Sequence, residues 1–331
     1  MALTMYDIAR LKDTNFEKGI VEMFIRESDL LKVFPFENID TMSIQTRRMA
    51  SLPPTQWRER GQRFFDGGQV GFETVVDSLF NTGAEINIDD ADMKDKGPFI
   101  VNPLKFNTEA KVKAIVYDFH DKVINGDHAV DPNSFEGLKV RIGGLASTQS
   151  LYTASLLDVR PSTITVSNAY TWLERIDEAK YACDGHTADI CLTDGDFIRA
   201  LKHALRVIGQ YVNAPGTPPA NLNERESSNF VAPTAGRAFV WDEVRYIDMG
   251  VKADQTTHIV ATETIGSACR PAYFVKLGDA YLNAIQYAPL DVKPPFMLDD
   301  GVTFRSIISW YVGLRHVHNR FAVKMSGSQV A

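Results

Sequence analysis

The chain has 331 residues, of which 44% are hydrophobic and 23% charged, and this composition excludes a disordered or collagen-like protein. Its 35 Lys and Arg residues against 42 Asp and Glu residues give a net charge of -7, which argues against a dedicated nucleic-acid binder. Three widely spaced cysteines and the lack of any long apolar run predict a protein that folds in a cytoplasm, without a disulfide framework or a membrane span.

The first 40 residues are predicted to form short helices that share one apolar stripe. Phe16, Ile20 and Phe24 recur at helical spacing, and Pro35 ends the pattern. Such a stripe has to pack either on its own domain or on a neighbouring molecule, and the sequence favours neither over the other. We therefore count these three residues among the candidate intersubunit contacts.

Residues 41–71 are predicted to form a long, arginine-rich hairpin. Apolar and polar residues alternate from Met42 to Thr46 and again from Trp57 to Phe65, and a glycine-rich turn cluster follows. A lone hairpin is marginally stable in water, so it needs a partner surface. Arginine pairs with carboxylates as well as with phosphates, and the acidic total favours a protein partner over nucleic acid, with a solvated face as the third alternative. The candidate contacts are Arg47, Arg48, Trp57, Arg58, Arg60, Arg63, Phe64 and Phe65.

The clearest predicted element is a helix over 108–125, with Asn107 as its N-cap and Asn125-Gly126 as its end. Strand-like alternation precedes it around Phe72–Val76 and Ala84–Ile88. The apolar face of the helix is formed by residues at i, i+3, i+4, i+7 and i+11, which are Val112, Ile115, Val116, Phe119 and Val123.

The later part of the chain alternates between predicted strands and helices. Asn168 and Asp194 are the expected N-caps of two helices, and Ala188–Leu192 is the strand between them. Val302–Leu314 alternates over an unusually long strand, and Phe321–Lys324 is its expected return.

Motifs that carry chemistry are scarce. The sequence has no phosphate-binding loop, no dinucleotide fingerprint and no nucleophile elbow. Cys183, His186 and Cys191 do not have the spacing of a zinc site, and a structural role is favoured for them. His316 and His318 are expected on one face of a strand, where a structural role is again favoured. We assign no catalytic residue, no cofactor and no metal ligand.

The order of elements resembles the major capsid proteins of tailed bacteriophages with the Hong Kong 97 type fold. The resemblance rests on Phe24–Ser28 in the arm, Asn125–Asp127 after the helix, Phe135–Leu138, and Arg305–Arg315 in the closing strand. It implies an α+β capsid fold with four parts: an N-terminal arm at 1–40, an extended loop at 41–71, a peripheral domain at 72–149 and 296–331 with its spine helix at 108–125, and an axial domain at 150–295.

The resemblance also implies a function. Such subunits form pentamers and hexamers that close into the icosahedral head shell around double-stranded DNA, which they enclose without sequence-specific binding. The implied partners are further copies of the chain, a separate scaffolding protein, since the chain begins almost directly with the arm, and a portal protein; a decoration or cement protein is a further candidate. The implied location is the virion capsid, assembled in the bacterial host cytoplasm.

No lysine occurs between Lys32 and Lys94, so we expect a shell without the isopeptide bonds that other members form from the extended loop. An encapsulin-type compartment shell is the nearest alternative function. An α/β enzyme that uses His186 or His203 as acid-base within 160–210 is a remote one.

Overall fold

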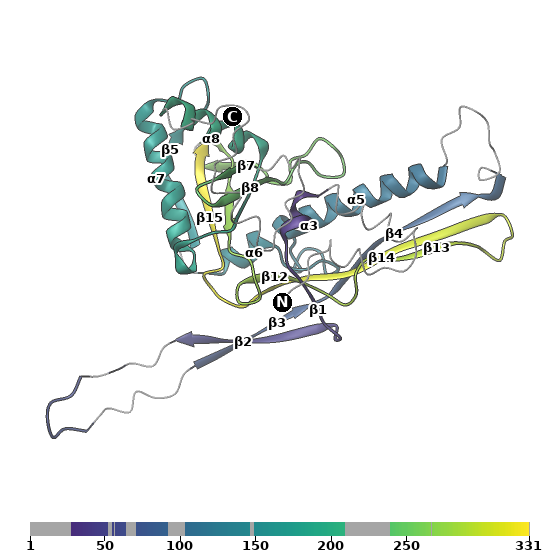
Figure 1. The fold of residues 1–331 in the computed structure, drawn as a ribbon, viewed down its shortest axis with the longest axis horizontal. Helices are drawn as coiled ribbons and strands as arrows, with labels where there is room; N and C mark the ends of the chain where they lie inside the picture. The colour runs from purple at the N-terminus through teal and green to yellow at the C-terminus, as the bar shows by residue number, and fades with distance from the viewer. Residues whose placement is uncertain are drawn as a thin grey trace, which may run out of the picture.

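The computed structural model describes residues 28–51, 55, 57–63, 71–91, 103–145, 149–208, 239–265 and 267–330. They form two larger sheets, with helices packed on each, and a two-stranded hairpin that projects from the body (Figure 1). Two further strands, β9 (Glu263–Ile265) and β10 (Ser267–Cys269), pair with each other.

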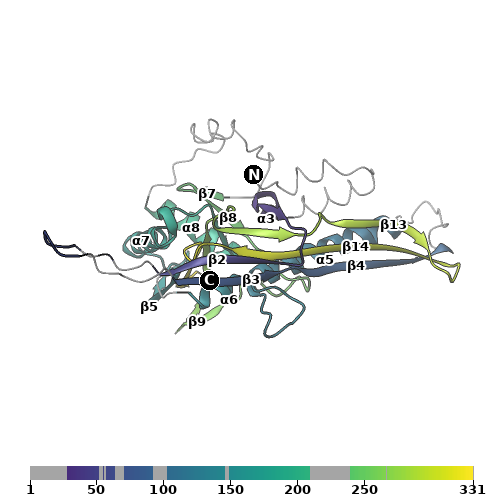
Figure 2. The ribbon, with the colours of Figure 1, turned by 90° about the horizontal axis from the view of Figure 1, so that it is seen from below.

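The first sheet is built around one long strand, β14 (Thr303–His316). β4 (Phe80–Asp89) pairs antiparallel with it over ten residues, from Asp89 opposite Thr303 to Phe80 opposite Val312. The other edge of β14 pairs with β13 (Asp291–Met297) and β12 (Leu282–Gln286), and β1 (Phe36–Asn38) extends the sheet beyond β12. β4, β13 and β14 continue beyond the body as a narrow tongue (Figure 2).

Helix α5 (Pro103–Asn125) packs its apolar face against this sheet, and the five residues expected on that face are buried. The ring centroids of Phe119 and Trp310 lie 5.0 Å apart across the contact. The expected start at 108 is wrong, because the helix begins at Pro103, a residue that fits a first helical turn, and Asn107 lies inside it. The expected end at Asn125 is confirmed.

The second sheet has six strands, and helices α7 (Val166–Ala182) and α8 (Gly195–Val207) cover one of its faces. In sheet order the strands are β5 (Ser150–Asp158), β15 (Ala322–Gln329), β11 (Ala272–Val275), β6 (Ile190–Thr193), β8 (Val244–Asp248) and β7 (Phe239–Trp241). Along β11, Phe274 faces these helices while Tyr273 and Val275 join the core under α5. Both faces are therefore buried, which explains the nearly continuous apolar runs in these strands.

Two expected boundaries in this region differ from the structure. Thr165, rather than Asn168, caps α7, because its hydroxyl accepts a hydrogen bond from the Asn168 amide. A strand does follow β14, but it does not return along β14; β15 crosses to the second sheet and pairs with β11 and β5. The expected domain boundary at residue 296 therefore does not follow the sheets. β12 and most of β13 lie before residue 296 but share a sheet with β14, whereas β15 lies after it and belongs to the second sheet.

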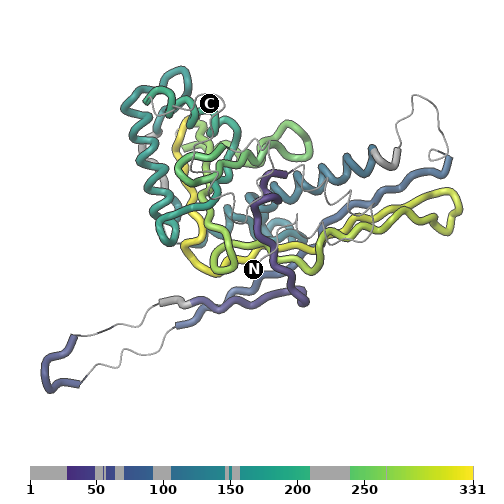
Figure 3. Tube along the Cα trace, in the orientation of Figure 1, coloured from purple at the N-terminus to yellow at the C-terminus, as the bar shows by residue number. Residues whose placement is uncertain are grey.

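The hairpin consists of β2 (Ser43–Ser51) and β3 (Gly71–Ser78). The second strand was expected at Trp57–Phe65, but residues 57–63 form a turn and irregular chain without strand pairing. Only Leu79 separates β3 from β4, so the chain runs almost continuously from the hairpin into the tongue (Figure 3). The hairpin and the tongue point in opposite directions (Figure 2).

Three short helices complete the described structure: α3 (Asp29–Val33), α6 (Leu138–Gly143) and the 3-10 turn η2 (Asp184–His186). Ser28 caps α3 by accepting a hydrogen bond from the Leu31 amide, and its oxygen also lies 2.6 Å from Nε2 of His120 on α5. This contact attaches the start of α3 to helix α5.

Candidate intersubunit surface

The base of the hairpin is attached to the body by a buried ion pair. Arg141 on α6 donates from NH2 to Oδ1 of Asp77 on β3 at 2.8 Å, and the two side chains are 4% and 3% exposed. The Arg141 guanidinium also donates to the carbonyl oxygens of Glu136 at 2.8 Å and Leu314 at 3.0 Å. These bonds compensate for much of the cost of burying the positive charge.

His316, at the end of β14, lies between two arginines. Its Nδ1 is 2.5 Å from NH1 of Arg141, and its Nε2 is 2.6 Å from NH1 of Arg48 on β2. Burial and the two guanidinium groups lower the pKa of His316 to about 3, so the imidazole is neutral at pH 7. A neutral imidazole has one acceptor nitrogen, so only one arginine at a time can donate to it.

Two further arginines make contacts at the hairpin base. Arg48 also donates to Oδ1 of Asn319 at 2.6 Å and pairs with Glu73 at 3.4 Å. Arg315 on β14 pairs with Glu37 at 2.6 Å and donates from Nε to the hydroxyl of Thr46 on β2 at 3.1 Å. The base is thus fixed to α6, to β14 and to Asn319 after β14 at the same time.

Beyond its base, the hairpin is exposed along β3 and at its described tip, residues 57–63. Phe72 is 72% exposed, and Val76 is also exposed. At the tip Trp57 is 100% exposed, and Arg58 closes the turn by donating to the carbonyl oxygen of Gln62 at 2.8 Å. A two-stranded ribbon of this kind cannot bury its own apolar side chains.

The candidate contacts from the sequence fall into three groups. Arg47, Trp57, Arg58, Arg60 and Arg63 are exposed on the hairpin, as an intersubunit role requires. Arg48 instead faces its own chain. The other five, Phe16, Ile20, Phe24, Phe64 and Phe65, lie outside the described residues.

Sequence reasoning missed the residues that hold the hairpin, and no local signal could have identified them. The partners of Arg141 and His316 come from segments separated by as many as 268 residues, and each is an ordinary polar position in its own segment. The residues at the hairpin base that were missed are Glu37, Asp77, Arg141, Arg315 and His316.

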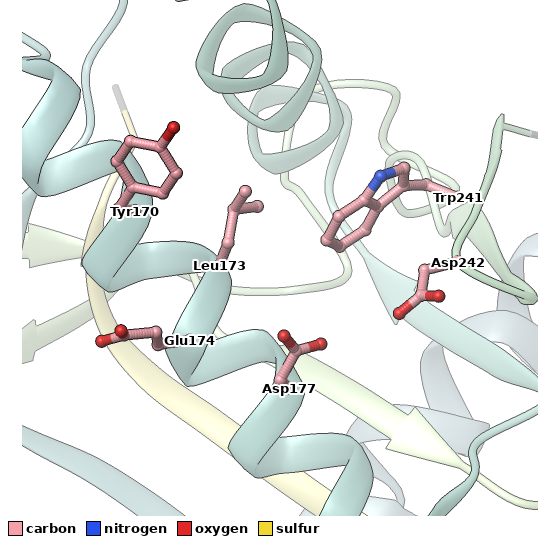
Figure 4. A pocket seen from close by; sticks show the side chains of 6 residues that line it. All are labelled: Tyr170, Leu173, Glu174, Asp177, Trp241 and Asp242. Carbon is pink, nitrogen blue, oxygen red and sulfur yellow. The ribbon is translucent and has the colours of Figure 1, made fainter. Parts of the chain in front are cut away.

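A second surface feature is a groove between α7 and the β7–β8 turn (Figure 4). Lys180 pairs with Asp177 at 2.7 Å and with Asp242. We call this feature the acidic aromatic groove; its lining residues are Tyr170, Leu173, Glu174, Asp177, Trp241 and Asp242.

The candidate chemical groups are not brought together. Cys183 and Cys191 are buried, whereas His186 is exposed against Tyr181, and the described part of the chain has no cluster of three or more residues able to hold a metal ion. His203 has a buried Nδ1 that finds no hydrogen-bond partner among the described residues. The expectation that His316 and His318 share a strand is wrong, since β14 ends at His316. None of the described helices is long and apolar enough to cross a membrane.

No protein-family model and no curated protein sequence matches the chain. Solved structures do match it. The capsid of a native GTA particle has a TM-score of 0.60 at 11% identity, over 92% of this chain and 91% of that one. The holo-SrpI encapsulin complex from Synechococcus elongatus PCC 7942 has a TM-score of 0.54 at 11% identity, over 100% and 98%. The capsid of Myoviridae phage XM1 has a TM-score of 0.52 at 12% identity, over 87% and 86%. The chain therefore has the Hong Kong 97 type α+β fold of tailed-phage capsid proteins, as the sequence predicts.

Proposed function

We propose that the chain is the major capsid protein of a tailed phage, a structural subunit that assembles as pentamers and hexamers into an icosahedral head shell. The observation that carries the proposal is the projecting hairpin, anchored at its base and exposed along β3 and at its tip, on a fold shared with shell proteins. An isolated subunit gains nothing from fixing an exposed ribbon by a buried ion pair. A subunit that holds its neighbours needs such a ribbon in a fixed direction.

The remaining parts of the proposal concern partners and location. We assign the shell to the virion, with assembly in the bacterial host cytoplasm, a separate scaffolding protein and a portal protein. The net charge of -7 fits a shell that encloses double-stranded DNA without holding it at the wall, because each neutralised phosphate would add favourable counterion release. A decoration or cement protein is a further partner under the same proposal.

An encapsulin-type shell is the second candidate, since the encapsulin match spans the whole chain at a TM-score of 0.54. The two functions differ in what the shell encloses. A small-molecule enzyme is disfavoured, because neither His186 nor His203 is placed beside a nucleophile and an orienting group in the described structure.

The test is to express the full chain with a scaffolding protein and to examine the product by negative-stain microscopy. Closed particles with icosahedral symmetry are expected. Nuclease-protected double-stranded DNA in particles purified from infected cells supports the phage capsid, whereas a co-purified enzyme without DNA supports the encapsulin. A chain that stays monomeric at high concentration with its scaffold contradicts both.

A further inference from the structure

His120 is a buried histidine at which three separate parts of the chain meet. It belongs to α5, and its side chain is only 6% exposed. Its Nε2 lies 2.6 Å from the hydroxyl oxygen of Ser28, the residue that caps α3. The backbone of Met249, directly after β8, also bonds to the ring. The side chain therefore joins α3, α5 and the end of β8 at one point.

The contacts of this junction suit a neutral imidazole. The Ser28 oxygen accepts a hydrogen bond from the Leu31 amide at 3.0 Å, which leaves its hydroxyl hydrogen for Nε2 of His120. A neutral ring can accept that hydrogen, whereas a protonated ring carries a hydrogen on both nitrogens and accepts none. Proton uptake thus takes the acceptor away from the hydroxyl and places a charge in a contact without water.

The carboxylates on the elements packed around His120 are already paired with lysines. On α3, Asp29 faces the ring but pairs with Lys32 at 2.7 Å. On α5, Asp121 pairs at 3.1 Å with Lys252, which follows β8. Burial, opposed by the weaker effects of the Met249 backbone and Asp29, lowers the pKa of His120 to about 4. The ring therefore resists protonation for as long as it stays covered.

α3 can leave this position without disturbing the rest of the fold. It packs against α5 (Figure 1), and a helix of five residues is not stable by itself, so it depends on its cap and on the burial of Leu30, Leu31 and Phe34. The next element is held independently, because β1 pairs with β12 and Glu37 pairs with Arg315 at 2.6 Å. Opening of α3 can therefore stop before β1 and requires no change in either sheet.

We propose that His120 is an acid-sensitive latch that holds α3 on α5. When the ring takes up a proton, α3 opens as one unit and the imidazolium is exposed to water. Residues 1–27 precede α3 in the chain, so its opening moves the point at which they leave the body. The inference goes beyond the proposed function and concerns the single subunit, so it does not depend on shell assembly.

The direction and the size of the effect follow from proton linkage. The pKa of the ring is 6.5 when water surrounds it and about 4 when α3 covers it. The open form therefore becomes more favourable relative to the closed form as the pH falls from 6.5 towards 4. Between pH 7 and pH 4.5 the population of the open form should rise by roughly fiftyfold.

The test is hydrogen–deuterium exchange of the full chain, measured by mass spectrometry at pH 7 and pH 4.5 and corrected for the intrinsic effect of pH on exchange. Peptides from residues 28–34 should lose protection by roughly fiftyfold. Peptides from α8, which packs in the other core, should keep theirs. His120→Gln cannot take up the proton and should abolish the loss at 28–34. His316→Gln, the matched control at the hairpin base, should retain it.

The wild-type chain alone can overturn the latch. Unchanged protection of residues 28–34 at pH 4.5 contradicts it, and equal losses in α3 and α8 show that acid unfolds the subunit as a whole. A full loss that persists in folded His120→Gln assigns the effect to another group and also overturns it. Each of these results leaves the proposed function intact, since that function is tested by particle formation.

Discussion

Asp77 Oδ1 and Arg141 NH2 lie 2.8 Å apart in a nearly water-free contact that joins the hairpin to α6. The pair is the sole link between β3 and α6 among the ion pairs of the described residues. Breaking it leaves one charge buried without its partner, which costs far more than losing a surface ion pair.

Asp77→Asn is therefore expected to destabilise the unassembled subunit by about 3 to 5 kcal/mol. The measurement is the free energy of unfolding in urea. Glu178→Gln, which removes the exposed partner of Arg175, is the matched control and is expected to cost about 1 kcal/mol or less. Equal losses in the two variants contradict a stabilising role for the buried pair.

Acid is expected to destabilise the subunit through two buried histidines, His120 and His316. Burial lowers the pKa of His120 to about 4, and that of His316 is about 3. In the unfolded chain both histidines take up a proton below the ordinary histidine pKa of 6.5. In the folded chain they stay neutral until the pH approaches their lowered pKa values. Stability is thus complete above pH 6.5 and falls as the pH drops towards 4.

This pH dependence is checked by thermal melting between pH 7 and pH 4. His120→Gln and His316→Gln cannot take up the proton, so each variant should lose Tm less steeply with falling pH than the wild type. An unchanged slope in both variants would falsify the assignment to these histidines.

Charge reversal of the hairpin tip is expected to block assembly and leave the fold intact. Arg58→Glu, Arg60→Glu and Arg63→Glu together alter exposed side chains that support no core packing. Sedimentation should show folded subunits and no particles. The control reverses three exposed charges elsewhere, at Lys111, Lys139 and Arg199, and keeps assembly. Particles of normal size from the tip variant would show that the hairpin tip does not hold neighbouring subunits together.

A shell of this chain is expected to dissociate into single chains on a denaturing gel. The segment from residue 33 to residue 93 contains no lysine, so the hairpin cannot supply the amine of an isopeptide bond. Mature particles boiled in detergent and reductant should give one band at 36.9 kDa. A ladder of higher bands that survives reductant shows covalent joining from another part of the chain.

Elements with a regular apolar period could be predicted from sequence, and their ends could not. The i, i+3, i+4, i+7 spacing identified the buried face of α5. Its first turn was missed because Phe106 there is exposed and adds nothing to the pattern. Alternation identified β14, but Trp57–Phe65 alternates too and forms no strand at 57–63, because alternation alone does not provide a pairing partner.

Contacts between distant segments were beyond the reach of sequence patterns. The fold class followed from the order of elements, yet the crossing of β15 to the second sheet depends on how the turn after His316 directs the chain. The exposed arginines of the hairpin could be predicted as a cluster. That Arg48 belongs to the anchor depends on His316, which is 268 residues away.

The near-continuity of β3 and β4 gives the subunit a mechanical property. A neighbour that pulls on the hairpin tip loads one extended run of chain from residue 71 to residue 89. The pull acts along β4 and is shared by its ten pairings with β14, so it shears them together instead of unzipping them one by one. Internal pressure on a shell of such subunits would be carried as tension along β4, and each subunit would resist stretching more than bending.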